Sequence, residues 1–186
     1  MRTFIAVELD KNIKEALSKI QLELEKADAD AKWVSAQNIH LTLKFLGEVK
    51  EEKIPKIIQC LKETADATAD FQIEIRGAGA FPGAKSPRVI WAGISKGKEE
   101  LLRLAGLIED GLVKLKFPKE ERKLCAHITI GRVKSPKNKD ALSKAIAQLQ
   151  LSPLLQQVKS ITLFKSTLTP KGPLYEKLSE EKLKKS

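Results

Sequence analysis

The sequence predicts an α+β fold in which antiparallel sheets carry helices on their outer faces. Segments with alternating apolar residues, typical of strands, occur between segments with apolar residues at helical spacing. Several strand-like segments follow one another through turns, which favours antiparallel pairing over a doubly wound parallel sheet. The length of 186 residues fits one domain, or two small lobes that share a core.

The first half of the chain alternates strand-like and helix-like segments. Phe4 to Glu8 alternates as a strand does, and Asp10 is suited to cap the helix that follows. The expected elements are strands at 4–8, 71–75 and 89–92, helices at 13–24 and 51–61, and a glycine- and proline-rich loop at 77–87.

The second half repeats this theme and ends in a charged tail. The expected elements are helices at 101–112 and 142–149, strands at 126–133, 158–168 and 175–178, and a turn at 171–173. We expect the tail, residues 180–186, to be frayed.

Charge and hydropathy limit the class of protein. The net charge of +10, from 34 Lys+Arg against 24 Asp+Glu, attracts polyanions, although a solvated lysine face would give the same balance. No segment has the apolar length that crosses a membrane. The short apolar run before Glu8 differs from a signal peptide, so we expect a cytoplasmic protein without a membrane partner.

The two cysteines, Cys60 and Cys125, lie far apart in the sequence. Neither belongs to a CxxC pair, so we expect isolated thiols in a reducing compartment. Cys125 falls on the face of His127, where it either borders the pocket or, as we expect, is a buried residue without a role. The sequence also lacks the glycine-rich phosphate loops of Walker and dinucleotide-binding proteins.

The chain contains only two histidines, and their surroundings match. His40 and His127 each lie in the pattern apolar–His–apolar–Thr–apolar, with Thr42 and Thr129 as the threonines. Two such matches arise by chance at well under ~1 in 1,000. The repeat therefore indicates an internal duplication, or one chemistry built twice.

Strand geometry explains this spacing. Side chains alternate faces along a strand, so His40 and Thr42 point one way while Leu41 and Leu43 point into the core. His127 and Thr129 are expected to do the same on the second strand. We expect both imidazoles to face each other across one phosphate-sized gap.

This set of side chains suits phosphodiester chemistry. An imidazole holds or releases a proton near neutral pH, so two of them serve as acid and base. The threonine hydroxyls can donate hydrogen bonds to phosphate oxygens, where charge gathers in the transition state. We expect no cofactor and no metal.

Two simpler interpretations of the histidines compete with catalysis. A single histidine on a strand is more often a hydrogen-bonded structural residue, but two in matched settings favour catalysis. A zinc site needs a third ligand, and none stands at a recognisable spacing.

On these motifs the sequence resembles the 2H phosphoesterase superfamily, defined by two His-x-Thr-x motifs. Within it, the sequence is most similar to the RNA 2′,3′-cyclic phosphodiesterase family, formerly called 2′-5′ RNA ligase. The resemblance covers nearly the whole chain, including residues 2–8, 33–49, 87–93, 127–134 and 172–176.

The resemblance implies a bilobal α+β fold with two pseudo-symmetric lobes that flank a basic cleft. Each lobe would have an antiparallel sheet, outer helices and one motif, and the intertwined lobes would form a single domain over 1–186. The implied reaction is hydrolysis of an RNA 2′,3′-cyclic phosphate to a 2′-phosphomonoester.

The resemblance also assigns roles to residues. His40 would be the proton donor to the departing 3′ oxygen, and His127 the proton acceptor that activates water. Thr42 and Thr129 would bind the phosphate, and Phe45 and Arg132 would flank the terminal nucleobase. Counting by twos puts Phe45 on the face opposite His40, so this role needs a kink or the end of the strand. The alternatives are a core position for Phe45 and an ordinary surface position for Arg132.

Three further positions are less decisive. Arg88 and Lys134 are weaker candidates for RNA contacts. Relatives usually carry proline just before the second histidine, where this chain has Ala126, so the entry to that strand is expected to differ.

Other functions are compatible with the same residues. The same site run in reverse would join a 5′-hydroxyl to the cyclic phosphate and make a 2′-5′ linkage. A non-catalytic RNA-binding protein would not need histidine at both positions. We expect a monomer acting on RNA with a 2′,3′-cyclic phosphate end. The sequence does not choose among tRNA fragments, other cleaved RNAs and small cyclic nucleotides.

Overall fold

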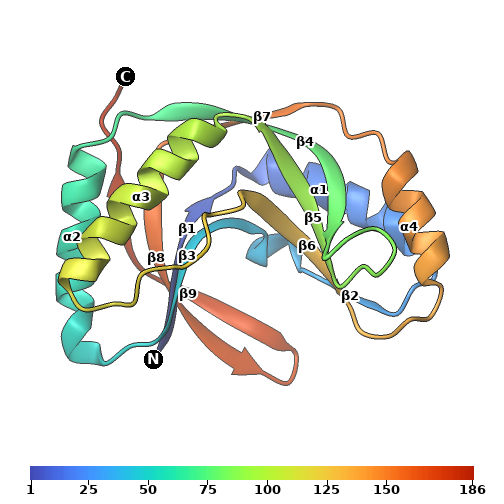
Figure 1. Ribbon diagram of the computed structural model, residues 1–186, viewed down its shortest axis with the longest axis horizontal. Helices are drawn as coiled ribbons and strands as arrows, with labels where there is room; N and C mark the ends of the chain where they lie inside the picture. The colour runs from blue at the N-terminus through green and yellow to red at the C-terminus, as the bar shows by residue number, and fades with distance from the viewer.

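The computed structural model describes residues 1–186 as two antiparallel sheets with four α-helices (Figure 1). The first sheet has the strand order β3-β1-β8-β9, and the second has the order β2-β6-β5-β4-β7. Two short 3₁₀ helices, Ala36–Asn38 and Glu51–Lys53, precede β3 and α2. The predicted α+β class is confirmed.

The first sheet is built around β1 (Arg2–Glu8), whose residues from Thr3 to Val7 are all buried. This strand pairs with β3 (His40–Glu48) on one side and with β8 (Ser160–Thr169) on the other. A long hairpin joins β8 to β9 (Gly172–Lys182) and projects from the body of the molecule (Figure 1).

The second sheet holds the remaining five strands. Its bounds in spatial order are β2 (Ala31–Trp33), β6 (His127–Val133), β5 (Val89–Lys96), β4 (Phe71–Phe81) and β7 (Leu154–Val158). Each sheet therefore contains one of the two histidine motifs, at the start of β3 or β6.

The helices cover the two sheets in pairs. α2 (Ile54–Asp66) and α3 (Lys98–Lys114) lie side by side against the first sheet, and α1 (Lys11–Glu25) and α4 (Lys139–Gln148) lie against the second (Figure 1). α1 follows a strand of the first sheet yet packs on the second, and α3 does the reverse. The chain thus crosses between the sheets. None of the helices combines the length and apolarity that a membrane span requires.

Two predicted segments differ from the structure. The expected loop at 77–87 is wrong in its first part, because β4 continues to Phe81 and pairs with β5 as far as Val89. Gly77 adopts φ +76°, which accommodates an extra residue in β4 without ending the strand.

The expected frayed tail is also wrong. β9 extends to Lys182, and the side chain of Leu183 is 6% exposed. Lys184 then forms a bridge with Ala69. The apolar residues predict only a short strand at 175–178. Pairing with β8 extends that strand through the charged residues up to Lys182.

Candidate active site

The two histidines stand at equivalent positions of two neighbouring strands. His40 is the first residue of β3 and His127 is the first residue of β6, and these strands contact each other where the two sheets meet. Both histidines are half-buried, as are Thr42 and Thr129. The intervening leucines and isoleucines are buried, as the predicted alternation requires: Leu41, Leu43, Ile128 and Ile130.

A bulge at the same place in both strands brings Phe45 onto the face of His40. Along β1, Glu8, Ala6 and Phe4 share one face, and they stand opposite His40, Thr42 and Phe45 respectively. One extra residue in β3, Leu43, causes this shift in register. The kink that Phe45 requires is therefore present.

The second motif repeats this bulge. Gly93, Trp91 and Val89 of β5 stand opposite His127, Thr129 and Arg132 of β6. Arg132 consequently lies on the histidine face, like Phe45 in β3, and both side chains are exposed. The matched register shifts give the two strands the same geometry beyond the His-x-Thr-x motifs themselves.

Each imidazole is held by the backbone just before it. Nδ1 of His40 lies 2.6 Å from the carbonyl oxygen of Asn38, and Nδ1 of His127 lies 2.6 Å from that of Cys125. A carbonyl oxygen only accepts hydrogen bonds, so both Nδ1 atoms carry hydrogen. In the neutral form of each ring, Nε2 is therefore the nitrogen without hydrogen, which can accept a hydrogen bond.

Thr42 differs from Thr129 in its contacts. Its hydroxyl oxygen lies 3.0 Å from Nε2 of His40, so it donates to the neutral ring. Thr129 makes no such bond to His127. The first motif is thus hydrogen-bonded within itself, with the Thr42 hydroxyl beside Nε2 of its own histidine.

Aromatic rings surround His40. Phe4 packs against it with ring centroids 4.8 Å apart, and Tyr175 meets it edge-on at 5.4 Å. Burial lowers the pKa of His40, opposed by its hydrogen bond to the Asn38 carbonyl and aided by the positive charge of Lys14. In the free protein the ring therefore favours its neutral form.

His40 borders a hollow of about 230 Å³. Its wall contains the charged side chains of Glu8 and Lys14. The part of the wall that belongs to β9 consists of Leu174 and Tyr175. Nζ of Lys177 lies 2.7 Å from the carboxylate of Glu8, which therefore faces a cation.

His127 borders a second hollow of about 350 Å³. Phe81 and Trp91 line it, and the Phe81 ring meets the His127 ring edge-on at 5.0 Å. Cys125 also lines this hollow and is exposed, so the expectation of a buried Cys125 is wrong. The chain reaches β6 from an open loop, which leaves the thiol uncovered.

The two histidines line different hollows, His40 the first and His127 the second. The structure brings their strands into contact, and Arg132 of the second motif lies close enough to Tyr175 for its charge to favour the ionised phenol. Burial outweighs this charge and raises the pKa of Tyr175. That both imidazoles face one phosphate stays a prediction.

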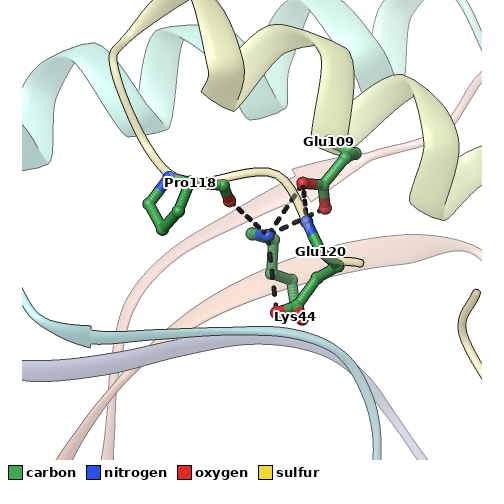
Figure 2. Close-up of polar contacts among 4 residues, drawn as sticks. All are labelled: Lys44, Glu109, Pro118 and Glu120. Carbon is green, nitrogen blue, oxygen red and sulfur yellow. Dashed lines mark hydrogen bonds and ion pairs between the residues drawn. The ribbon is translucent and has the colours of Figure 1, made fainter. Parts of the chain in front are cut away.

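Behind the motif strand, a buried lysine ties β3 to the segment that leads to His127. Nζ of Lys44 lies 2.8 Å from the Glu109 carboxylate of α3 and 3.6 Å from that of Glu120, and it donates to the Pro118 carbonyl oxygen (Figure 2). The Glu120 backbone N–H also donates to Glu109. One buried cation therefore anchors the loop between α3 and β6.

Sequence reasoning missed several residues of this site. Lys44 was visible as the one charge within an apolar strand segment, and Tyr175 as the only tyrosine of the chain. Phe81 fell within the predicted loop, and nothing local indicated its contact with His127. Arg88 and Lys134 are exposed, without a contact that gives them a role.

Comparison with known proteins places this geometry in a family. The sequence model of the LigT-like phosphoesterase family matches residues 7–91 and 93–175, so that each matched segment contains one histidine motif. The RNA 2′,3′-cyclic phosphodiesterase of Methanothermobacter thermautotrophicus is 39% identical over 94% of this chain and 95% of its own length. That of Archaeoglobus fulgidus is 41% identical over 96% and 98%.

Solved structures agree with the fold. The Thermus thermophilus protein TT0787 superimposes with a TM-score of 0.83 at 31% identity, covering 100% of both chains. Escherichia coli LigT complexed with 3′-AMP gives a TM-score of 0.77 at 24% identity over 98% of this chain and 97% of its own, which supports the fold alone. With two sheets, two matched motifs and relatives matched over nearly their full lengths, the chain belongs to the LigT-like phosphoesterase family of 2H enzymes.

Proposed function

We propose that this enzyme hydrolyses the 2′,3′-cyclic phosphate at the end of an RNA to a 2′-phosphomonoester. The observation that carries the proposal is that both imidazoles are held in the same way. In each, Nδ1 donates a hydrogen bond to the backbone carbonyl oxygen two residues earlier. The relatives named RNA 2′,3′-cyclic phosphodiesterase support the substrate class.

In the proposed mechanism His127 takes a proton from water as the water oxygen attacks phosphorus. The bond from phosphorus to the 3′ oxygen breaks, and His40 gives its Nε2 proton to that oxygen. The phosphate remains on the 2′ oxygen. Each of these proton transfers typically contributes about 10²–10⁴-fold to the rate, and the two together need no metal ion.

Thr42 and Thr129 are proposed to donate hydrogen bonds to the non-bridging phosphate oxygens. Each threonine lies on the same face of its strand as the histidine of its motif. Negative charge on the non-bridging oxygens grows toward the transition state, where these hydrogen bonds would stabilise it. Bound phosphate also offsets the low pKa of His40, since a nearby anion favours the protonated imidazole.

Phe45 and Arg132 are proposed to flank the terminal nucleobase. Their equivalent positions after the two bulges support this role, because an aromatic face and a guanidinium plane both stack on bases. We propose that the whole chain, residues 1–186, acts as one catalytic unit and as a monomer, with tRNA fragments among its substrates.

An oligoribonucleotide that ends in a 2′,3′-cyclic phosphate tests this function. We expect conversion to a product whose phosphate is on the 2′ oxygen, located by phosphorus NMR, at a rate that EDTA leaves unchanged. A 3′-phosphate product would contradict the assignment of the broken bond. A rate abolished by EDTA would contradict the two-histidine mechanism.

A further inference from the structure

The hollow beside His127 has the features of a nucleotide site that the proposed function does not use. We propose that it is a second nucleotide subsite, which binds a base on Phe81 and Trp91 and a backbone phosphate between Arg76 and Lys98. This inference rests on the proposed function, because the hollow adjoins the histidine assigned to the attacking water.

The aromatic wall lies on the same face as the second motif. Trp91 stands opposite Thr129 in β6 and opposite Gly79 in β4. Phe81 meets Trp91 with ring centroids 5.2 Å apart and an interplanar angle of 37°. Phe81 also contacts the His127 ring, so aromatic side chains line the hollow from Trp91 to the imidazole. Aromatic side chains stack bases with little regard to sequence.

Two glycines give the indole its place. A Cβ on Gly79 would collide with the Trp91 ring, and a Cβ on Gly93 would stand 3.3 Å from that ring and 2.9 Å from the Arg76 carbonyl oxygen. The absence of side chains here lets Trp91 lie across the sheet. Gly93 is also the residue opposite His127, so no side chain of β5 stands beside the imidazole at this position.

Two unpaired cations stand on the wall of the hollow. Arg76 precedes the bulge at Gly77 in β4, and Lys98 begins α3. Both are exposed, and neither makes an ion pair within the chain. The charge of Arg76 reaches the Glu74 carboxylate, but Glu74 forms its ion pair with Lys96. Two cations outside any ion pair, next to aromatic rings, suit a phosphodiester followed by a base.

The size of the hollow fits one nucleotide unit. Its volume of about 350 Å³ lies at the lower end of the range for small-molecule sites, about 300–1,000 Å³. The proposed terminal base site at Phe45 and Arg132 has different side chains from this hollow, so the two sites would hold two different nucleotides.

The occupant has two sources. One is the penultimate nucleotide of the strand that carries the cyclic phosphate. The other is the first nucleotide of a second RNA, whose 5′ oxygen attacks phosphorus in place of water. In that step the 5′ hydroxyl proton goes to His127, the bond to the 3′ oxygen breaks, His40 protonates that oxygen, and a 2′-5′ diester forms.

The first arm of the test compares kcat/KM for 2′,3′-cyclic AMP with that for the dinucleotide ApA ending in a 2′,3′-cyclic phosphate. We expect wild type to prefer the dinucleotide by about 10-fold or more, since stacking one base on aromatic rings has effects of this order. In the double variant R76A/K98A this preference should fall, because the phosphate of the added nucleotide loses both cations while the aromatic rings remain. The matched control R103A/K114A, two exposed cations elsewhere on α3, should keep it.

The second arm supplies 2′,3′-cyclic AMP together with adenosine 3′-phosphate, which has a free 5′ hydroxyl. The measured quantity is the ratio of 2′-5′ dinucleotide to 2′-AMP, which does not depend on how well the donor binds. A ratio that saturates with added nucleotide, and is lost in R76A/K98A but not in R103A/K114A, identifies the second RNA as the occupant.

Either positive arm supports the subsite and names its occupant. Equal kcat/KM for the two substrates in wild type, with no saturable 2′-5′ product, overturns it. The single variant W91A is a second, independent test. It removes the surface for the base and leaves both cations, and it should lower the same preference or product ratio as R76A/K98A does. Wild type without turnover of any cyclic phosphate would instead reject the proposed function, and the subsite with it.

Discussion

At the scale of single residues, the two imidazoles are oriented by carbonyl oxygens rather than by carboxylates. We predict that His40→Ala and His127→Ala each lower kcat for a cyclic phosphate substrate by at least ~10²-fold, because each removes one proton transfer. Both rings are half-buried, so circular dichroism should stay native. Full activity in either variant would reject that residue's role.

The lowered pKa of His40 predicts the shape of the pH profile. If His40 is the acid, kcat/KM falls as pH rises through the pKa of its free-protein form, which lies below the usual value of about 6.5. In the complex, the phosphate anion raises that pKa, so the alkaline limb of kcat should lie at higher pH. An alkaline limb of kcat/KM well above 6.5 would contradict His40 as the acid.

The residues of both motifs could be predicted from the sequence. The side chains that surround them could be predicted only in part. His40, Thr42, His127 and Thr129 follow from a repeated local pattern. The position of Phe45 could not be predicted, since simple alternation puts it on the wrong face and the bulge is set by pairing with β1. Contacts of Tyr175 with His40 depend on a strand distant in sequence.

At the scale of elements, β3 is tied through Lys44 to the loop that leads into β6. The Lys44 and Glu109 side chains are 4% and 15% exposed, so removing one charge leaves the other buried without its partner. We predict that Lys44→Met lowers the free energy of unfolding by about 3–5 kcal/mol, as for other buried pairs.

Lys26→Met is the matched control for this element. Lys26 pairs with Glu23 at 2.7 Å, but both side chains are largely exposed, at 71% and 59%. Such pairs contribute about 0–1 kcal/mol, so urea unfolding should separate the two variants clearly. Equal stability losses in the two variants would show that Lys44 does not anchor the loop.

The elements themselves were predictable where apolar periodicity is strong, as in α1, α2 and α3. The shortfalls lie where tertiary pairing overrides local composition. β4 passes through a glycine-rich stretch because β5 supplies its hydrogen-bond partners. β9 contains many charged residues and is still a strand, because β8 supplies hydrogen-bond partners along its length. β2, three residues long, has no local signal.

At the scale of the whole molecule, the duplicated motif predicted two related halves, and the family model also matches the chain in two segments. The crossing of α1 and α3 between the sheets could not be predicted, because periodicity does not report which sheet a helix covers. The contact between β3 and β6 is likewise non-local, and it is what brings the two motifs near each other.

The net charge of +10 predicts how salt affects the whole enzyme. We expect KM for an oligoribonucleotide substrate to rise steeply between about 50 mM and 200 mM KCl, while kcat changes little, because the release of counterions from backbone phosphates favours binding less at high salt. KM for 2′,3′-cyclic AMP, with one phosphate, should change much less. Equal salt dependence for both substrates would show that the basic surface does not bind the RNA chain.

The proposed mechanism requires that both histidines share a single phosphate. A crystal structure of this enzyme with a bound nucleoside 2′-phosphate tests this requirement directly. We predict that Nε2 of His40 and Nε2 of His127 each lie within about 3.2 Å of oxygens of that phosphate or its 3′ hydroxyl. A phosphate bound by one histidine alone, with the other ring facing only its own hollow, would contradict the paired roles of the two imidazoles.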